Sequence, residues 1–260
     1  MSDDILYLPG QYLSRHIRNT LVANDFPNLY WSDDWSLQYY WKQAYLGFIA
    51  TAWYVENNPI LLPELQESYA VLYHECLKED RNVRRIRTRT PREGQSYCLK
   101  VDSNLEVILN HLHSIRPNSS WLIPEYQKLI SDLAHDQGRT LPISFWATSL
   151  ETPQGTAAGE LGYTIGKTYT SLSGFHYREK PEWNHFGKLQ MVLLSEHLNQ
   201  RGIEFWNLGH PQYKYKRDLG AQVISRKDFL SLWDKEVEKP APSLTKEITG
   251  ELSPEKQPTT

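Results

Sequence analysis

The sequence predicts a mixed α/β fold in which a hairpin, a helix and a further strand follow one another in the second half of the chain. Apolar runs bounded by turn residues predict strands over 142–149, 158–165 and 168–174. Gly166-Lys167 separates the last two strands by the two residues of a tight hairpin turn. Apolar residues recur at helical spacing through 184–200, and 203–207 follows as a strand. A strand, a crossover helix and a strand in this order imply parallel pairing of 168–174 with 203–207.

The first half of the chain predicts short aromatic strands mixed with helices. Strands are expected over 29–31, 48–53 and 69–73, and helices over 35–45, 104–115 and 122–135. Ser32, Asp33 and Asp34 offer N-cap side chains to the first helix, and Gly47 follows its end.

Three parts of the chain are expected. Residues 1–140 form an N-terminal mixed α/β part that carries a basic cluster, and 141–238 form a second α/β domain. Residues 239–260 contain four Pro and no aromatic residue, so we expect a disordered tail there.

The composition excludes several classes of protein. Among 260 residues the net charge is −3, so any nucleic-acid surface must be a local patch. No run of about 18 apolar residues exists, and the acidic start Met1-Ser2-Asp3-Asp4 is not typical of a signal peptide, so no membrane partner and a cytoplasmic location are expected. Cys76 and Cys98 are too few for a disulfide scaffold or a four-thiolate zinc site, and the scattered His residues predict no metal site.

An arginine-rich segment over 78–92 is the densest charge feature. It contains six Arg and one Lys against Glu79 and Asp80. The planar guanidinium suits phosphate oxygens, so this segment is a candidate phosphate-binding surface. A solvated surface with internal ion pairs is the alternative.

A second unusual segment covers 203–221. Asn207 ends a strand, Gly209 allows close approach of the backbone, and His210 begins a turn. Tyr and Lys alternate from 213 to 216, a pattern that can stack on bases and neutralise phosphate. The alternative is a strand end followed by an amphipathic helix, with His210 only a capping donor.

Glu160 lies inside an otherwise apolar strand. A buried carboxylate needs a partner or becomes protonated, so Glu160 is a candidate acid/base group or a receptor for a cation. The alternative is that Glu160 points outward, since strand residues alternate between faces. Ser171 and Ser173 are expected to share one face of their strand, and neither lies in a G-x-S-x-G elbow. No phosphate-loop or dinucleotide fingerprint is present.

Short motifs spread over residues 28–235 resemble, in their order, those of the leucyl/phenylalanyl-tRNA–protein transferase family. Ala44-Tyr45-Leu46-Gly47-Phe48 resembles A-Y-x-x-G-x-F, and Pro59–Glu64 resembles P-I-x-W-W-S-P with both Trp replaced. The Arg cluster at 81–85 stands where the family has S-R-S-L-R-R. Further along the chain, 121–126 is similar to W-I-T-x-x-M, 143–146 to S-V-E-V-W, 173–175 to S-M-F, 205–209 to L-I-D-C-Q and 219–221 to L-G-A.

The resemblance implies a GNAT-like transferase domain over 141–238. It also implies transfer of Leu, Phe or Met from aminoacyl-tRNA to a protein N-terminus bearing Arg or Lys, with no cofactor besides the tRNA co-substrate. The residues expected to bind tRNA are Arg81, Arg84, Arg85, Arg87, Arg89, Lys214 and Lys216. Those expected to bind substrate are Trp206, Tyr163, Phe175 and Gly209.

This sequence departs from the family at the carboxylates. The glutamate of G-E-S-M-F becomes Leu172, and the aspartate of L-I-D-C-Q becomes Asn207. The remaining polar candidates for catalysis are Asn207, Ser173, Glu160 and His210. We expect Asn207, His210 and Ser173 to line a cleft where the two parallel strands end together.

Two other functions compete with aminoacyl transfer. An acyl-CoA N-acyltransferase would use the same scaffold, but the loop before the central helix holds only Gly187 together with the bulky Trp183 and Phe186. A non-catalytic tRNA-binding module is favoured by the replaced carboxylates.

Overall fold

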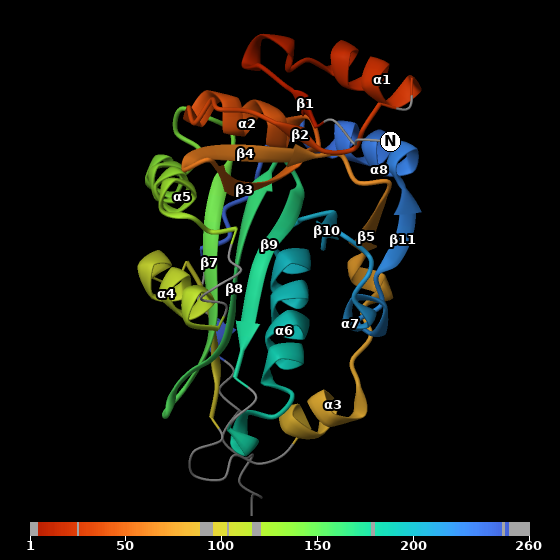
Figure 1. Cartoon of the computed structure of the whole chain (residues 1–260). Helices are drawn as coiled ribbons and strands as arrows, with labels where there is room; N and C mark the ends of the chain where they lie inside the picture. Colours follow the sequence, from red (N-terminus) through yellow and green to blue (C-terminus); the bar gives the residue numbers. More distant parts are fainter. Residues whose placement is uncertain are drawn as a thin grey trace, which may run out of the picture.

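The computed structural model describes residues 5–24, 26–88, 96–102, 104–115, 121–177, 180–245 and 248–249. In this part of the chain, the central sheet has eight strands in the order β11-β5-β10-β9-β8-β7-β6-β12. Helices flank it on both sides, and the N-terminal segments lie at one end (Figure 1).

The strands of the central sheet are interspersed with helices along the sequence. The strands are β5 (Ser68–Leu72), β6 (Cys98–Val101), β7 (Ser144–Thr152), β8 (Gly155–Ile165), β9 (Thr168–His176), β10 (Phe205–Asn207), β11 (Gln222–Ser225) and β12 (Ile248–Thr249). The helices that follow the N-terminal layer are α3 (Arg81–Thr88), α4 (Leu105–Ile115), α5 (Pro124–Asp136), α6 (Phe186–Gln200), α7 (Lys214–Asp218) and α8 (Arg226–Glu236).

The N-terminal layer contains two small ribbons, two α-helices and the short 3₁₀ helix Gly10–Tyr12. β1 (Leu6–Tyr7) pairs in parallel with β2 (Tyr30–Trp31), and β3 (Ile49–Val55) pairs antiparallel with β4 (Asn58–Glu64). The helices are α1 (Arg15–Ala23) and α2 (Leu37–Tyr45), each with a Ser N-cap that accepts a backbone N–H.

The predicted mixed α/β class is confirmed. β8 and β9 form the antiparallel hairpin around Gly166-Lys167, and β9 pairs in parallel with β10 across the crossover helix α6. The other four strand predictions, over 29–31, 48–53, 69–73 and 142–149, match β2, β3, β5 and β7 to within a few residues.

Two apolar clusters cover the two faces of the central sheet. On the α6 face, Tyr169 and Trp206 pack with leucines of α6. On the opposite face, Phe145, Tyr163 and Phe205 pack with residues of α2, α5 and α8. Residues that alternate along β9 and β10 therefore point either beneath α6 or toward the N-terminal layer.

Several elements were not predicted from the sequence. β4 carries Pro59 and Pro63, which disfavour a central strand, yet it is stable in a two-stranded ribbon. Glu56 and Asn57 both have positive φ, at 50° and 67°, and turn the chain from β3 into β4. Residues 81–88 of the arginine-rich segment form helix α3, and β6, β11 and α8 were also unpredicted.

The predicted division near residue 140 does not separate two sheets. β5 and β6 precede residue 140 but lie in the same sheet as β7 to β11. One apolar cluster likewise runs from Leu8 to Val237.

The predicted disordered tail over 239–260 is wrong for its first part. Leu244 is fully buried in the cluster beneath α6, and its carbonyl contacts His197 Nε2 at 2.8 Å. β12 pairs with β6, and residues 250–260 lie outside the described residues. The composition of this segment did not reveal its docking, because one apolar residue among the prolines, Leu244, holds it against the cluster beneath α6.

We expect Leu244→Ala to lower the free energy of unfolding by about 2–4 kcal/mol, because it leaves a cavity under α6. Urea denaturation would measure this, with Ser243→Ala as an exposed neighbour that changes stability little. Equal stability of Leu244→Ala and the wild type would contradict the docking of this segment.

Candidate functional site at the ends of strands β9 and β10

β9 and β10 separate after only three paired residues. The last pair is Thr170 with Asn207, while β9 continues to His176. Among the described residues, no strand pairs with this stretch of β9 on the β10 side. The separation leaves an open backbone edge beside the end of β10.

A β-bulge lies at the point of separation. Gly162 pairs with Ser171 and Leu161 pairs with Ser173, so Leu172 is the extra residue. Because Gly162 and Leu161 point to opposite faces, Ser171 and Ser173 do as well. The prediction that these two serines share a face is wrong, since a bulge reverses the alternation.

Glu160 is buried on the α6 face of the sheet, where its carboxylate accepts hydrogen bonds from neighbouring side chains. Its Oε1 accepts from the Tyr169 hydroxyl at 2.8 Å and from Ser171 Oγ at 3.0 Å. Ser171 Oγ in turn accepts from Trp206 Nε1 at 2.7 Å. Gln190 of α6 donates from Nε2 to Thr148 Oγ1 at 3.2 Å, and its amide lies near enough to Glu160 to lower the pKa of that carboxyl. The inward orientation of Glu160 is therefore the correct alternative.

Burial raises the pKa of Glu160 to about 7, and the hydrogen bonds from Tyr169 and Ser171, together with the nearby Gln190 amide, limit that rise. Gly162 makes this arrangement possible. A Cβ at position 162 would collide with the Tyr169 hydroxyl, so only glycine leaves room for that ring to reach Glu160. The carboxyl group can thus exchange a proton near neutral pH.

Asn207 is placed differently from the expectation. It is 1% exposed and lies on the face opposite Trp206. Its Oδ1 accepts the Gly209 N–H at 2.9 Å, and its Nδ2 lies 3.4 Å from Thr170 Oγ1. The expected open amide lining a cleft is therefore not present, because the amide is occupied in fixing the turn after β10.

Lys216 fixes the same turn from the other side. It is 6% exposed, and its Nζ donates to the carbonyls of Leu208 at 2.5 Å and His210 at 2.7 Å. Burial lowers its pKa to about 8. Lys216 as a ligand of tRNA phosphate stays a prediction, and the direction of its ammonium into the protein argues against that role. Gly209 sits within this turn at φ +70°, whereas the His210 side chain is exposed.

The aromatic residues predicted to bind substrate are buried and divided between the faces. Trp206 lies beneath α6, while Tyr163 and Phe175 belong to the opposite cluster. Phe175 stacks on His111 of α4 with ring centroids 4.9 Å apart, and His111 Nδ1 contacts the Tyr177 hydroxyl at 2.5 Å. Ser173 and Asn207 thus lie on one face, and Glu160 and Ser171 on the other.

The arginines of α3 differ in exposure, and the exposed Arg84 also pairs through Nε with Glu79 Oε2 at 3.9 Å. Arg81, Arg84 and Arg85 are exposed. Arg87 is half-buried and forms a bidentate pair with Glu196 at 2.7 and 3.1 Å, so it joins α3 to α6 and is not free for phosphate. Arg89 lies outside the described residues.

Helix α7 presents a second exposed surface. Tyr213 and Tyr215 are 52% and 43% exposed, and their rings stack with centroids 6.0 Å apart. Lys214 is exposed and pairs with Asp218 within the helix. The Lys78 N–H donates to the Leu219 carbonyl at 2.8 Å, so the segment that leads into α3 lies beside the end of α7. Helices α3 and α7 both lie beside α6 (Figure 1).

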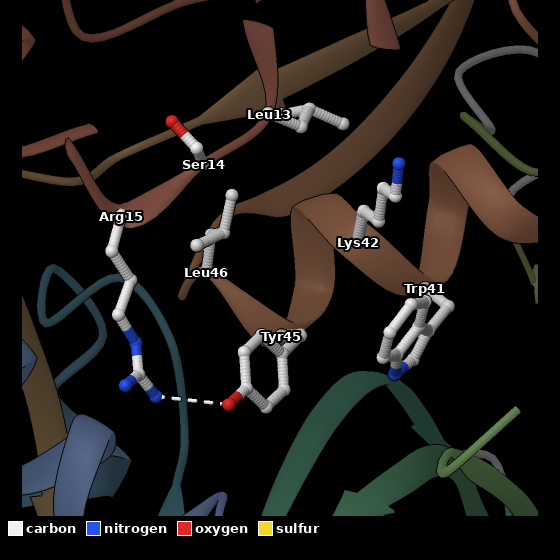
Figure 2. Close-up of a pocket in the computed structure, with 7 residues that line it drawn as sticks. All are labelled: Leu13, Ser14, Arg15, Trp41, Lys42, Tyr45 and Leu46. Carbon is white, nitrogen blue, oxygen red and sulfur yellow. Dashed lines mark hydrogen bonds between the residues drawn. The ribbon is translucent and has the colours of Figure 1, made fainter. Parts of the chain in front are cut away.

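A cavity of about 280 Å³ lies between α1 and α2, away from the predicted site residues. Figure 2 shows Arg15 directed at the Tyr45 hydroxyl, with Trp41 and Lys42 on the adjacent turns of α2. None of the residues predicted to act in catalysis or binding lines it.

No metal cluster or membrane-spanning helix is found in the described part of the chain. No group of three or more His, Cys, Asp or Glu side chains there could hold a metal ion. No helix there is long and apolar enough to cross a membrane. Cys76 and Cys98 are both free.

Comparison with known proteins decides the family. A sequence profile described as leucyl/phenylalanyl-tRNA protein transferase matches residues 71–234, which is more than half of the chain. The chain belongs to this family. The match includes α3, the β8–β9 hairpin, α6, β10 and most of α8, so it covers the bulge and the Glu160 network.

Two curated relatives in the leucyl/phenylalanyl-tRNA–protein transferase family are similar to it. The transferase of Maridesulfovibrio salexigens is 28% identical over 193 residues, 73% of each chain. That of Shewanella piezotolerans is 25% identical over 140 residues, and the chain spans about half of its length, 54%.

Solved structures resemble the chain more distantly. FemX matches with a TM-score of 0.43 and 9% identity, covering 85% of this chain and 80% of that one. L-PGS from Bacillus licheniformis matches with a TM-score of 0.42 and 10% identity, covering 86% of this chain and 76% of that one.

Sequence reasoning about this family member missed the partners of Glu160. Ser171, Tyr169 and Gln190 come from two elements, and only the bulge brings Ser171 toward the carboxylate. The one available signal was Gly162 between apolar strand residues, which marks close approach of another group.

Proposed function

We propose that this family member transfers a hydrophobic amino acid of the Leu, Phe or Met type from aminoacyl-tRNA to the N-terminal amine of a protein or peptide. Family membership supports the reaction class, and the relay from Ser171 to the buried Glu160 is the observation that carries the proposal. The relay sits where the open edge of β9 begins, so it is within reach of a substrate at that edge.

The hydrogen-bond inventory of Ser171 supports its role as a proton relay. Its hydroxyl proton is donated to Glu160, and one lone pair accepts from Trp206 Nε1–H. The second lone pair remains for an N–H of the attacking amine. Ser171 is half-buried, so a substrate can reach it while Glu160 stays dry.

The proposed reaction forms an amide and breaks an ester. The α-amine nitrogen of the acceptor attacks the ester carbonyl carbon of the aminoacyl-tRNA. The amine proton passes to Ser171 Oγ as the serine proton passes to Glu160. When the bond from carbon to the tRNA 3′ oxygen breaks, the proton returns by the same route to that oxygen. Backbone N–H groups on the open edge of β9 would stabilise the negative charge on the carbonyl oxygen.

The surface of α3 and α7 is proposed to bind the tRNA. Replacing Arg81, Arg84 and Arg85 with Ala should reduce affinity and lower the slope of log K against log salt by about two to three, since each exposed arginine that contacts phosphate releases a counterion. Filter binding at several salt concentrations measures this. Lys128 and Arg139, exposed on or beside α5, supply a control double variant whose slope should stay unchanged. An unchanged slope in the triple variant would leave these arginines as a solvated surface only.

Mass spectrometry tests the donor and the acceptor together. The protein is incubated with total charged tRNA and a set of peptides that differ only in their first residue. A mass increase of one Leu, Phe or Met residue that RNase treatment abolishes supports the proposal. Acetylation of the peptide from added acetyl-CoA, with no aminoacyl product, would instead support an acyl-CoA N-acyltransferase.

A further inference from the structure

The cavity between α1 and α2 is lined mostly by apolar groups. The rings of Trp41 and Tyr45 form part of its wall, with their centroids 5.8 Å apart and their planes tilted by 40°. Leu13 and Leu46 add aliphatic surface. The volume of about 280 Å³ lies just below the roughly 300 Å³ at which sites for drug-sized ligands begin. The cavity therefore fits a small apolar group.

Lys42 gives this cavity a positive charge without a partner. The side chain is half-buried, and it has no hydrogen bond or ion pair with any residue that the structure describes. Partial burial of an unpaired charge costs free energy, which a bound anion would offset. Lys42 also lies in the last turn of α2, where a cation stabilises the helix dipole. That stabilisation is compatible with a contact between the ammonium and a ligand.

Arg15, the other cation of the lining, is already paired. Its Nη1 donates to Glu238 Oε1 at 2.5 Å, and its Nη2 donates to the Tyr45 hydroxyl at 3.0 Å (Figure 2). Its Nε lies 3.6 Å from Asp234 Oδ1. None of the described residues that line the cavity is an aspartate or a glutamate. Lys42 therefore determines the sign of the charge that a ligand meets.

Carbonyl oxygens at the end of α2 are occupied by donors from other helices. The Tyr45 carbonyl accepts from Trp233 Nε1 of α8 at 2.9 Å. The Leu46 carbonyl accepts from Arg18 Nη1 of α1 at 3.3 Å. The negative end of the α2 dipole is thus satisfied within the protein and does not call for a cationic ligand.

Donors beside the cavity are not all occupied. Trp41 Nε1 is buried and has no hydrogen-bond partner among the described residues. Ser14 Oγ accepts the Ile17 N–H at 3.2 Å, which leaves the hydroxyl proton of Ser14 to be donated. Helix α1 begins at Arg15, so the positive end of its dipole borders the cavity. The unused hydrogen-bonding capacity and the charge both match an anion.

We propose that this cavity binds a carboxylate attached to an apolar group, either a free small acid or the last residue of a polypeptide chain. The apolar group packs against Trp41 and Tyr45, and the carboxylate accepts a charge-assisted hydrogen bond from Lys42. The proposal goes beyond aminoacyl transfer and does not rest on it. None of these residues belongs to the relay at Glu160 or to the surface proposed for tRNA.

Binding of naphthoate and naphthamide, measured without tRNA, tests the charge requirement. The two compounds have nearly the same shape, but only naphthoate is charged at neutral pH. Isothermal titration should show that the wild type binds naphthoate at least about tenfold more tightly. Lys42→Met keeps an apolar side chain, removes the ammonium and should abolish this preference. Lys128→Met, which removes an ammonium 77% exposed on α5, should keep it.

A second variant tests the location of the site. Leu13→Trp places a larger side chain in the cavity and should weaken binding of both compounds by about tenfold or more. A melting temperature close to that of the wild type establishes that each variant is folded. A short peptide that ends in Phe, compared with its C-terminal amide, distinguishes the two sources. A preference for the free carboxylate indicates a chain terminus as the ligand, and no binding of either peptide indicates a free acid.

Three results would overturn the proposal. The first is equal affinity of the wild type for naphthoate and naphthamide, or no binding of either. The second is a preference for naphthoate that Lys42→Met retains. The third is unchanged binding by folded Leu13→Trp, which would place the ligand elsewhere. A wild type that binds naphthoate as expected but never transfers an amino acid would refute the proposed function and leave the carboxylate site standing.

Discussion

Glu160→Gln is expected to lower the rate of aminoacyl transfer by about a hundredfold or more while leaving tRNA affinity unchanged. The amide cannot take the proton that Ser171 passes on, and general acid–base groups typically contribute about 10²–10⁴ in rate. tRNA affinity should not change because Glu160 is buried beneath α6, whereas the proposed tRNA surface lies on α3 and α7. Single-turnover transfer and filter binding would measure the two quantities separately. Ser171→Ala should reproduce the loss, since it breaks the same relay.

The pH dependence distinguishes a proton acceptor from a structural carboxylate. The rate of transfer by the wild type should increase as the pH rises through about 7, where Glu160 ionises. The acceptor's α-amine also loses its proton at about pH 7.7–8.0, so variants must be compared on the same peptide. Tyr169→Phe removes a hydrogen bond that stabilises the ionised carboxylate and should move the rise to higher pH. If the pH dependence of the rate in Tyr169→Phe is identical to that of the wild type, ionisation of Glu160 does not limit the rate.

The same pKa shift predicts the sign of a stability change. Folded Glu160 binds its proton up to about pH 7, whereas the unfolded side chain releases it at about pH 4.5. Stability of the wild type therefore falls as the pH rises across this window, by on the order of 3 kcal/mol. Glu160→Gln should flatten that fall.

Lys216→Met is expected to slow transfer by about tenfold to a hundredfold without changing the salt dependence of tRNA binding. The ammonium holds the carbonyls of Leu208 and His210, so its loss releases the turn that abuts the open edge of β9. Small displacements at a reacting centre are costly in rate. Single-turnover transfer and filter binding at several salt concentrations would measure the two effects. Lys214→Met is the matched control, since Lys214 is 79% exposed two residues away and is expected to affect tRNA binding instead.

Stability measurements add an independent check on Lys216. Folded Lys216 loses its proton near pH 8, and the unfolded side chain near 10.5, so wild-type stability should rise with pH between these values. Lys216→Met should abolish this rise. If Lys216→Met instead reduces the salt dependence of tRNA binding, Lys216 contacts tRNA phosphate.

The sequence was sufficient where local pattern decides structure. The two-residue turn at Gly166-Lys167 and the long apolar helix predicted the hairpin and the parallel crossover to β10. The family resemblance, read from short motifs in order, was confirmed by the match over 71–234.

It was insufficient where contacts between distant segments decide structure. A one-residue bulge at Leu172 turned Ser171 beneath α6, and no periodicity in β9 signals it. Lys216 looked like a phosphate ligand beside two tyrosines, but two carbonyls eight and six residues earlier capture its ammonium. The roles of Asn207, Ser173 and His210 in catalysis remain predictions, and the occupied amide of Asn207 makes Ser171 and Glu160 the stronger candidates.

In the proposed reaction the ester of aminoacyl-tRNA is the donor and a free α-amine is the acceptor. The most direct measurement is single-turnover transfer from radiolabelled leucyl-tRNA to an Arg-initiated peptide and to the same peptide with an acetylated N-terminus. We expect the amount of label lost from the tRNA to equal the amount gained in amide linkage by the peptide with a free N-terminus. The acetylated peptide should gain none. A protein that binds the leucyl-tRNA yet leaves its ester intact in the presence of either peptide would contradict it.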